Sequence, residues 1–240
     1  MAFGPDRNTM TRTQARSAEI DVGLRSYMLR VYNYMSLGVA FTGIVALLVA
    51  MNPAIMQAIA LGPMRIVLFF GIIGMGFIAP RIMMSKSVGA AQACFWVYAG
   101  MWGALMAPMF LLYTGDSMVR VFFITAASFA GLSLYGYTTK RNLAPMGAFL
   151  AMATIGILIA VLVNAFLLQS GMFHLVLAII VVLVFAGLTA YETQMIKNMY
   201  YESDGHDVTT RKAIFGAFLL YGSFVTIFIW LLSILGVMRE

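Results

Sequence analysis

Charged side chains are scarce in this sequence. Of its 240 residues, 10% are Asp, Glu, Lys or Arg and 62% are hydrophobic. Soluble domains carry about a quarter charged residues and fewer than half apolar ones. The mean hydropathy of +0.92 agrees that the polar surface a soluble fold needs is missing. The composition therefore excludes a conventional cytosolic enzyme, a nucleic-acid-binding module and a disordered chain.

Cysteine and histidine are nearly absent. Cys94 is the single cysteine, so an internal disulfide is excluded, and its apolar run favours a buried, inert thiol. His174 and His206 are the two histidines, too few for a histidine-rich metal site. The sequence also contains no phosphate loop, zinc motif or dinucleotide fingerprint. It therefore predicts no enzymatic activity, no cofactor and no catalytic residue.

Long runs without charge are what the sequence has instead. A membrane-spanning helix needs roughly 20 apolar residues, and backbone groups in lipid must bond within their own segment, which favours helices. The uncharged interval 142–191 is too long for one helix, but the polar triplet Gln169-Ser170-Gly171 divides it. The sequence thus predicts an all-α membrane protein with seven transmembrane helices, near 29–51, 63–84, 89–113, 118–138, 145–168, 172–194 and 213–236.

Lysine and arginine alternate between the two ends of these predicted helices. One side carries twelve of them, in the N-terminal tail and the second, fourth and sixth connections, whereas the other side carries Arg65, Arg120 and Arg239. An excess of Lys and Arg marks cytoplasmic loops. We therefore expect residues 1–28 to form a polar cytoplasmic tail and residues 29–240 a seven-helix transmembrane domain whose C-terminus lies on the far side.

Ionisable residues inside a membrane are costly, so they are candidate functional residues. Glu192 ends the sixth apolar run and Arg81 ends the second. Both are predicted on the cytoplasmic side at similar depth, where they either pair or simply sit at the interface. The sixth helix is expected to continue past Glu192, through Met195 and Ile196. Gly222-Ser223 in the last run indicates either close helix packing or a local break.

Three other patterns favour ordinary structural roles. Ser133 lies in a Gly-x-Ser sequence, but His174 is predicted near the opposite membrane face, so an intramembrane serine protease is rejected. The twenty methionines are scattered and read as apolar filler. The acidic segment 202–207 could bind calcium weakly, although its spacing fails the EF-hand pattern.

The segment from Phe185 to Lys197 resembles the sixth-helix signature of the Bax inhibitor-1 (YccA-type, TMBIM) family. Residues 137–143, the entry at 29–32 and the closing segment 216–236 also resemble it, so that the resemblance covers roughly residues 25–236. It implies a last helix that is central and wrapped by the other six. It also implies an acidic pair, one carboxylate from each of the last two helices, that accompanies a proton-sensitive calcium leak.

The sequence departs from that pattern at the acidic pair. The resemblance maps one acid onto Glu192 and the other onto Ser223, which cannot ionise. A latching arginine maps nearest to Arg81, although strict register places Met83 there. Because two close carboxylates share a proton and a lone one does not, we expect a weaker or acid-shifted pH response and weaker binding of divalent cations.

Two functions follow as expectations. The first is a passive, pH-sensitive calcium or cation leak in the bacterial inner membrane, with Glu192, Ser223, Arg81 and Gly222 as gate residues and no metal site. The second is a non-transporting regulator of membrane-protein turnover and stress survival, whose partner is a membrane-bound ATP-dependent protease. In both, lipids are partners and nucleic acid is not. A small-solute transporter lacks any internal repeat to support it.

Overall fold

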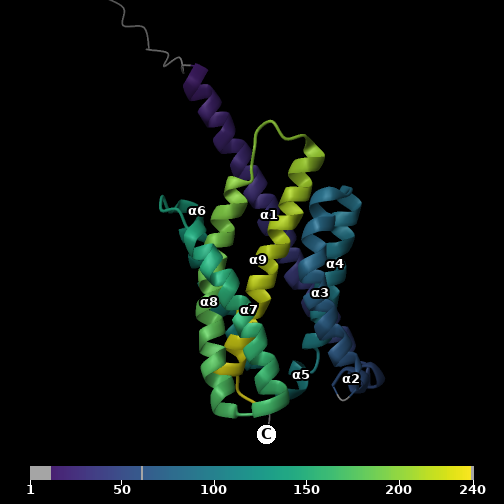
Figure 1. Cartoon of the computed structure of the whole chain (residues 1–240). Coiled ribbons are helices and arrows are strands. Elements are labelled where there is room, and N and C mark those ends of the chain that lie inside the picture. Colours follow the sequence, from purple (N-terminus) through teal and green to yellow (C-terminus); the bar gives the residue numbers. More distant parts are fainter. Residues whose placement is uncertain (1–11, 61, 239–240) are drawn as a thin grey trace, which may run out of the picture.

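The computed structural model describes residues 12–60 and 62–238, with side chains from Val22 onward. This part of the chain folds into helices with no β-sheet (Figure 1). The elements are α1 (Arg12–Ala50), α2 (Pro53–Ala60), α3 (Met64–Ser85), α4 (Val88–Met106), α5 (Met109–Leu112), α6 (Gly115–Thr138), α7 (Ala144–Val163), the π-helical η1 (Asn164–Leu168), α8 (Gly171–Asn198) and α9 (His206–Leu235).

Seven of these helical stretches are long and apolar enough to cross a membrane, which confirms the predicted all-α, seven-helix fold. The division of the long uncharged interval also holds. Gln169 ends η1 in the left-handed conformation, with φ of 47°. Ser170 then caps α8 by accepting a hydrogen bond from the Phe173 amide. A side-chain oxygen at this position satisfies an amide that the first helical turn leaves unpaired.

The first helix begins earlier than the apolar pattern indicates. It starts at Arg12, so residues 12–28 are helical, whereas the first spanning residue was placed at 29. Hydropathy marks where lipid begins, and a helix can continue into water beyond that point. Residues 1–11 of the expected tail lie outside the described residues, as does Arg239. The short helices α2 and α5 lie at the end of the bundle opposite the start of α1 (Figure 1). α2 is not predicted by the sequence, and α5 is the last part of the predicted helix 89–113, which the structure interrupts after Met106.

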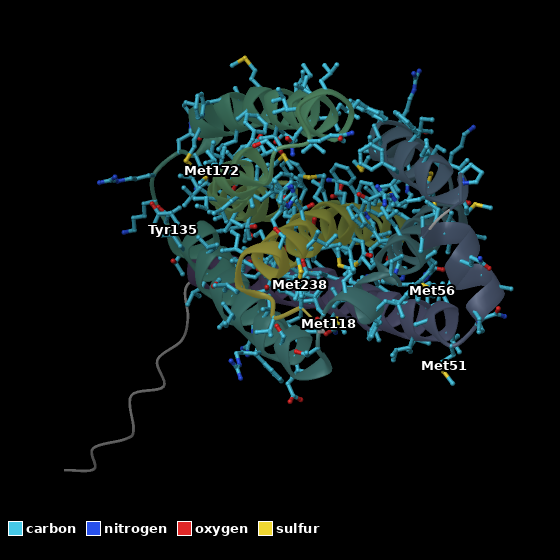
Figure 2. The ribbon with its side chains drawn as sticks, turned by 90° about the horizontal axis from the view of Figure 1, so that it is seen from below. Met51, Met56, Met118, Tyr135, Met172 and Met238 are labelled. Atoms are coloured by element: carbon cyan, nitrogen blue, oxygen red, sulfur yellow. The ribbon has the colours of Figure 1, made fainter. Side chains whose placement is uncertain are left out.

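The last helix occupies the centre of the bundle, as the view along the bundle in Figure 2 shows. α9 packs against α1, α3, α4, α6 and α8, while α7 packs mainly on α8. In its most apolar window 44% of the residues are buried, against 11–28% in the other six spans.

Small residues let two pairs of helices approach closely. A Cβ atom on Gly136 of α6 would lie 2.2 Å from the backbone oxygen of Ala190 in α8. A Cβ on Gly103 of α4 would lie 2.7 Å from the backbone oxygen of Thr42 in α1. In lipid the hydrophobic effect does not press helices together, so close packing and interhelical hydrogen bonds must hold the bundle. These glycines therefore set the spacing of the helices around α9.

Candidate functional site

The functional candidate Glu192 lies in a stretch of α8 whose other residues fasten α8 to its neighbours. The Gln194 amide donates to the Arg141 carbonyl (2.8 Å) and accepts from the Leu143 amide (2.8 Å), which fixes the α6–α7 connection. Thr193 bonds to Ser133 of α6 at 2.9 Å. Lys197 donates to the Tyr137 carbonyl at the end of α6 (2.8 Å). The signature segment is thus largely a set of packing and hydrogen-bonding positions.

Glu192 has a different environment from these neighbours. Ser223 of α9 donates a hydrogen bond of 2.7 Å to its Oε2 atom, and Ser223 itself is 2% exposed. The two residues that the resemblance assigned to the acidic pair are therefore in direct contact, as carboxylate and hydroxyl. Within the described residues there is no group of three or more His, Cys, Asp or Glu side chains arranged to hold a metal ion.

A partly open cavity of about 440 Å³ adjoins this pair and is lined by residues of α3, α4, α7, α8 and α9. Its polar lining groups besides Glu192 and Ser223 include the side chains of Tyr98, Trp102, Thr154 and Thr226. Buried Trp102 Nε1 has no hydrogen-bond partner among the described residues. The other wall residues extend from Glu192 toward the far ends of α3, α7 and α9, near Phe69, Val161 and Trp230.

On the opposite side of Glu192, toward the end of the bundle where α1 begins, the core is closed. Met83, Ile196 and Ile214 are each 0% exposed and belong to one apolar cluster. We call these three residues the inner plug. Ile196 lies one helical turn beyond Glu192 and also packs within 2.9 Å of where a Cβ on Gly216 would be. Glu192 thus lies between a partly open cavity and the fully buried apolar side chains of the inner plug.

The predicted role of Arg81 is not supported by its position. Arg81 is exposed, it does not line the Glu192 cavity, and within the described residues it makes no ion pair with Glu192. The reason is helical register: Ala79 and Met83 are each 0% exposed on the inner face of α3. Since a residue two positions along a helix points roughly 200° away, Arg81 faces outward and Met83 faces the core.

Lysine and arginine side chains at this end of the bundle donate hydrogen bonds to backbone carbonyls at the ends of α3, α6 and α8. Arg211 donates to the carbonyls of Met84 (2.8 Å) and Lys86 (2.9 Å). Lys212 donates to the Met199 carbonyl at 2.9 Å and pairs with Asp204. Lys197 donates to the Tyr137 carbonyl at the end of α6. Helix C-termini carry partial negative charge and unpaired carbonyls, so these basic residues have a structural task besides setting orientation.

Three further sequence candidates are placed as follows. α9 runs unbroken through Gly222, so of the two alternatives the structure has helix packing and no local break there. A Cβ atom on Gly222 would lie 3.6 Å from the Tyr98 hydroxyl of α4. Ser133 bonds to Tyr32 and Thr193, whereas His174 stacks near Trp230 with ring centroids 5.1 Å apart. In the acidic segment 202–207, Asp204 is engaged by Lys212.

The Tyr32–Ser133 bond was not foreseen. It crosses between α1 and α6 at 2.5 Å and continues to Thr193. Hydropathy alone carries no signal for it, because tyrosine and serine are common in membrane helices. A helical-wheel reading that placed Ser133 and Gly136 on one inward face would have been the available hint.

The fold and this site define a class: a multi-pass helical membrane protein with a partly buried carboxylate–hydroxyl pair beside a membrane cavity. The family model described as "Inhibitor of apoptosis-promoting Bax1" matches residues 24–240, and the chain belongs to this Bax inhibitor family.

Relatives are similar over nearly the whole chain. An uncharacterized protein of Rickettsia prowazekii is 38% identical over 97% of this chain and 98% of its own length. An uncharacterized protein of Caulobacter vibrioides is 36% identical over 97% of this chain and all of its own length. The inner membrane protein YbhL of Escherichia coli is 36% identical over 89% of this chain and 92% of its own length.

Proposed function

We propose that this protein is a passive cation leak, with calcium as the principal ion, in which Glu192 is the cation-attracting group and Ser223 its partner. The observation that carries the proposal is the position of the Glu192 carboxylate, which is hydrogen-bonded by Ser223 and lines a 440 Å³ cavity within the membrane helices. Ionisable groups at such depth are costly and mark ion pathways.

The membrane orientation is part of the proposal. With the N-terminus in the cytoplasm of a bacterial cell, the inner plug faces the cytoplasm and the cavity extends through the outer half of the membrane. The similarity to the inner membrane protein YbhL supports this location. A cation entering the cavity reaches Glu192 and stops at Met83, Ile196 and Ile214, so that the described conformation is closed and the leak requires these side chains to separate.

The cavity has features that suit a polar occupant. An unpaired buried N–H such as Trp102 Nε1 costs about 1–3 kcal/mol, which water entering with an ion would offset. One carboxylate, however, attracts a divalent cation less strongly than two. We therefore expect weaker calcium binding, and a response to pH at more acidic values, than in a relative with an acid at both positions.

The experiment is calcium flux into liposomes that contain the purified protein and an enclosed calcium indicator, measured across a pH series. The proposal predicts flux above that of protein-free liposomes. It also predicts that Ser223→Asp shifts the pH dependence toward neutrality, because two carboxylates in contact repel and share a proton. Protein that conducts no calcium at any pH, or a Ser223→Asp variant with unchanged flux and pH midpoint, contradicts it.

The second candidate is a non-transporting regulator of a membrane-bound ATP-dependent protease, with a role in stress survival. The sealed inner plug favours it, because a protein that does not conduct needs no route past Met83, Ile196 and Ile214. This candidate predicts no flux in liposomes together with specific co-purification of the protease from native membranes. The N-terminal tail or the 197–212 loop, in which residues 201–203 and 205–207 are exposed, would then be the contact surface.

A further inference from the structure

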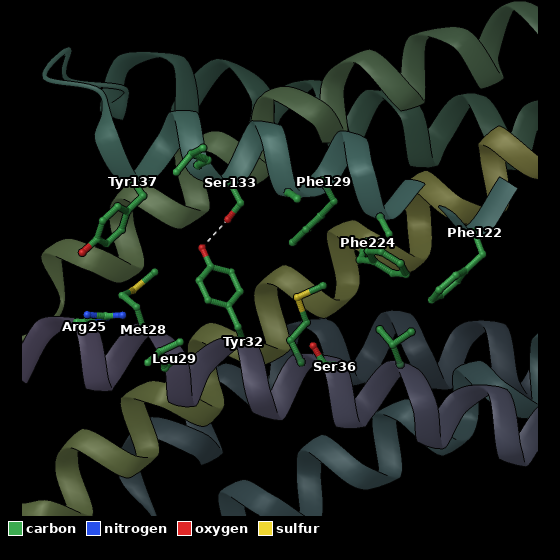
Figure 3. Close-up of a pocket in the computed structure, with 15 residues that line it drawn as sticks. Arg25, Met28, Leu29, Tyr32, Ser36, Phe122, Phe129, Ser133, Tyr137 and Phe224 are labelled. Carbon is green, nitrogen blue, oxygen red and sulfur yellow. Dashed lines mark hydrogen bonds between the residues drawn. The ribbon is translucent and has the colours of Figure 1, made fainter. Parts of the chain in front are cut away.

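A second cavity, unrelated to Glu192, lies between α1 and α6. Its volume is about 640 Å³, and Figure 3 shows it as a groove along the two helices, with the Tyr32–Ser133 hydrogen bond crossing it. Its floor is formed in part by Phe224 of α9. We call it the α1–α6 groove. Since both helices cross the membrane, lipid surrounds the open side of this groove.

The walls of the α1–α6 groove are mainly apolar, apart from Tyr32, Ser36 and Ser133 and the end near Arg25 and Tyr137. They include Leu29 and Val39 from α1, and Ala126, Ala130 and Leu134 from α6. Leu29, Ala130 and Leu134 are exposed in the absence of a bilayer. A groove lined in this way within the membrane is filled by hydrocarbon, because an empty cavity forfeits dispersion contacts and water has few polar partners there.

The length of the groove matches one leaflet of a bilayer. Its lining on α1 runs from Arg25 to Val39, and the fourteen helical steps between these residues span about 21 Å. A bilayer is about 40–45 Å thick with its headgroups, so one leaflet is about 20–22 Å. A further cavity of about 410 Å³ shares Val39, Phe122 and Phe224 with the groove and continues toward the other membrane face, which leaves room for a longer chain.

The two ends of the groove differ in charge. Arg25 lines the end near the start of α1, together with Tyr137, whereas the opposite end near Val39 and Phe122 is apolar. Arg25 is exposed, and a guanidinium group forms strong, directional hydrogen bonds with phosphate oxygens. A cation at headgroup level followed by a leaflet-long apolar groove is complementary to a phospholipid.

We infer that the α1–α6 groove is a binding site for one anionic phospholipid, whose acyl chain lies along the groove and whose phosphate is held by Arg25. The lipid comes from the leaflet at the end of the bundle where α1 begins. Its chain passes beside the Tyr32–Ser133 bond, which links to Thr193 on α8. This site is separate from the Glu192 cavity and does not depend on cation transport.

The test is native mass spectrometry of the full-length protein, delipidated in detergent and titrated with phosphatidylglycerol. Ala130→Trp fills the groove, and Ala127→Trp is its matched control, because Ala127 is also exposed on α6 but does not line the groove. We expect one tightly retained lipid on the wild type and on Ala127→Trp, and about tenfold weaker retention, or 1.4 kcal/mol, on Ala130→Trp. Ala126→Leu, one helical turn away, provides a second filling variant if Ala130→Trp does not fold.

The phosphate contact is tested separately with Arg25→Gln and with diacylglycerol, which has the same chains without phosphate. The wild type is expected to prefer phosphatidylglycerol over diacylglycerol by about tenfold, and Arg25→Gln to lose that preference. Equal lipid retention by wild type, Ala130→Trp and Ala126→Leu overturns the inference. So does a lipid preference that Arg25→Gln leaves intact, or a second protein copy that replaces the lipid in the mass spectrum.

Discussion

Ser223 on α9 donates a hydrogen bond of 2.7 Å to Glu192 on α8, joining the most buried helix to the helix that carries the family signature. Around this bond the other signature residues hold α8 against α6 and the α6–α7 connection. The Ser223–Glu192 bond therefore lies between the residues that fasten α8 to α6 and the cavity that both partners line.

Replacing Ser223 with alanine removes a donor to a carboxylate and leaves Glu192 without this partner. Hydrogen bonds to charged groups contribute about 1.5–3 kcal/mol, so we expect Ser223→Ala to lower the free energy of unfolding by about 1–2 kcal/mol in detergent micelles. Ser128→Ala, at an exposed position on α6, is the control and is expected to be neutral. Equal stability of the two variants would show that the bond contributes nothing to the fold.

Replacing Gly136 with alanine places a methyl group 2.2 Å from the Ala190 backbone oxygen. Backbone cannot give way as a side chain can, so α6 and α8 must separate, at about 1–3 kcal/mol. Gly131→Ala on the same helix has no atom within 4 Å of the new Cβ and is expected to be neutral or stabilising by up to about 1 kcal/mol. Thermal unfolding of both variants checks this, and a stable Gly136→Ala would refute the close packing.

Arg211 holds the C-terminal end of α3 through the carbonyls of Met84 and Lys86. We expect Arg211→Ala to fray that end, because the carbonyls lose a charged donor. Hydrogen exchange at residues 83–87 should accelerate by about fivefold to tenfold, which corresponds to about 1 kcal/mol. Arg81→Ala, at an exposed position of the same helix, should leave the exchange unchanged. Acceleration by Arg81→Ala and not by Arg211→Ala would reverse the assignment.

Seven spans put the two ends of the chain on opposite membrane faces, and the proposed orientation, based on the excess of Lys and Arg, has the N-terminus in the cytoplasm. Reporter fusions after Glu240 should therefore be active only with an extracytoplasmic reporter. Fusions at residues 140–142 should be active only with a cytoplasmic one. A C-terminal fusion that reports the same face as the N-terminus would contradict the orientation in which the inner plug faces the cytoplasm.

The sequence predicts the number and rough position of the helices because both depend on the surrounding lipid. A sufficiently long run without charged residues is stable as a helix in lipid and marks one spanning segment. The break at Gln169-Ser170 and the continuation of α8 to Asn198 are predictable for the same reason, since caps and helical spacing are local. The contact of Glu192 with Ser223 could be anticipated only through the resemblance, because no periodic pattern links two positions on different helices.

The sequence does not predict which side chains of a helix point into the core. α3 is apolar on all sides, so nothing in its pattern tells whether Arg81 or Met83 turns inward, and the packing of Ala79 and Met83 decides it. The start of α1 at Arg12 was missed because its first turns are polar, and hydropathy reports lipid rather than helix. The α1–α6 groove could not be predicted, because a cavity depends on how closely two helices pack in space, and hydropathy carries no information about that.

The central claim, that the Glu192 carboxylate attracts the cation that this protein conducts, is tested most directly by calcium flux through Glu192→Gln in liposomes. Glutamine keeps the size and can still accept the hydrogen bond of Ser223 but has no charge. Glu202→Gln, in an exposed loop, is the matched control, and both variants are first shown to unfold at the temperature of the wild type. The account predicts that Glu192→Gln loses at least about nine-tenths of the flux, a tenfold effect equivalent to 1.4 kcal/mol, while Glu202→Gln keeps it. Wild-type flux through a folded Glu192→Gln would contradict the claim.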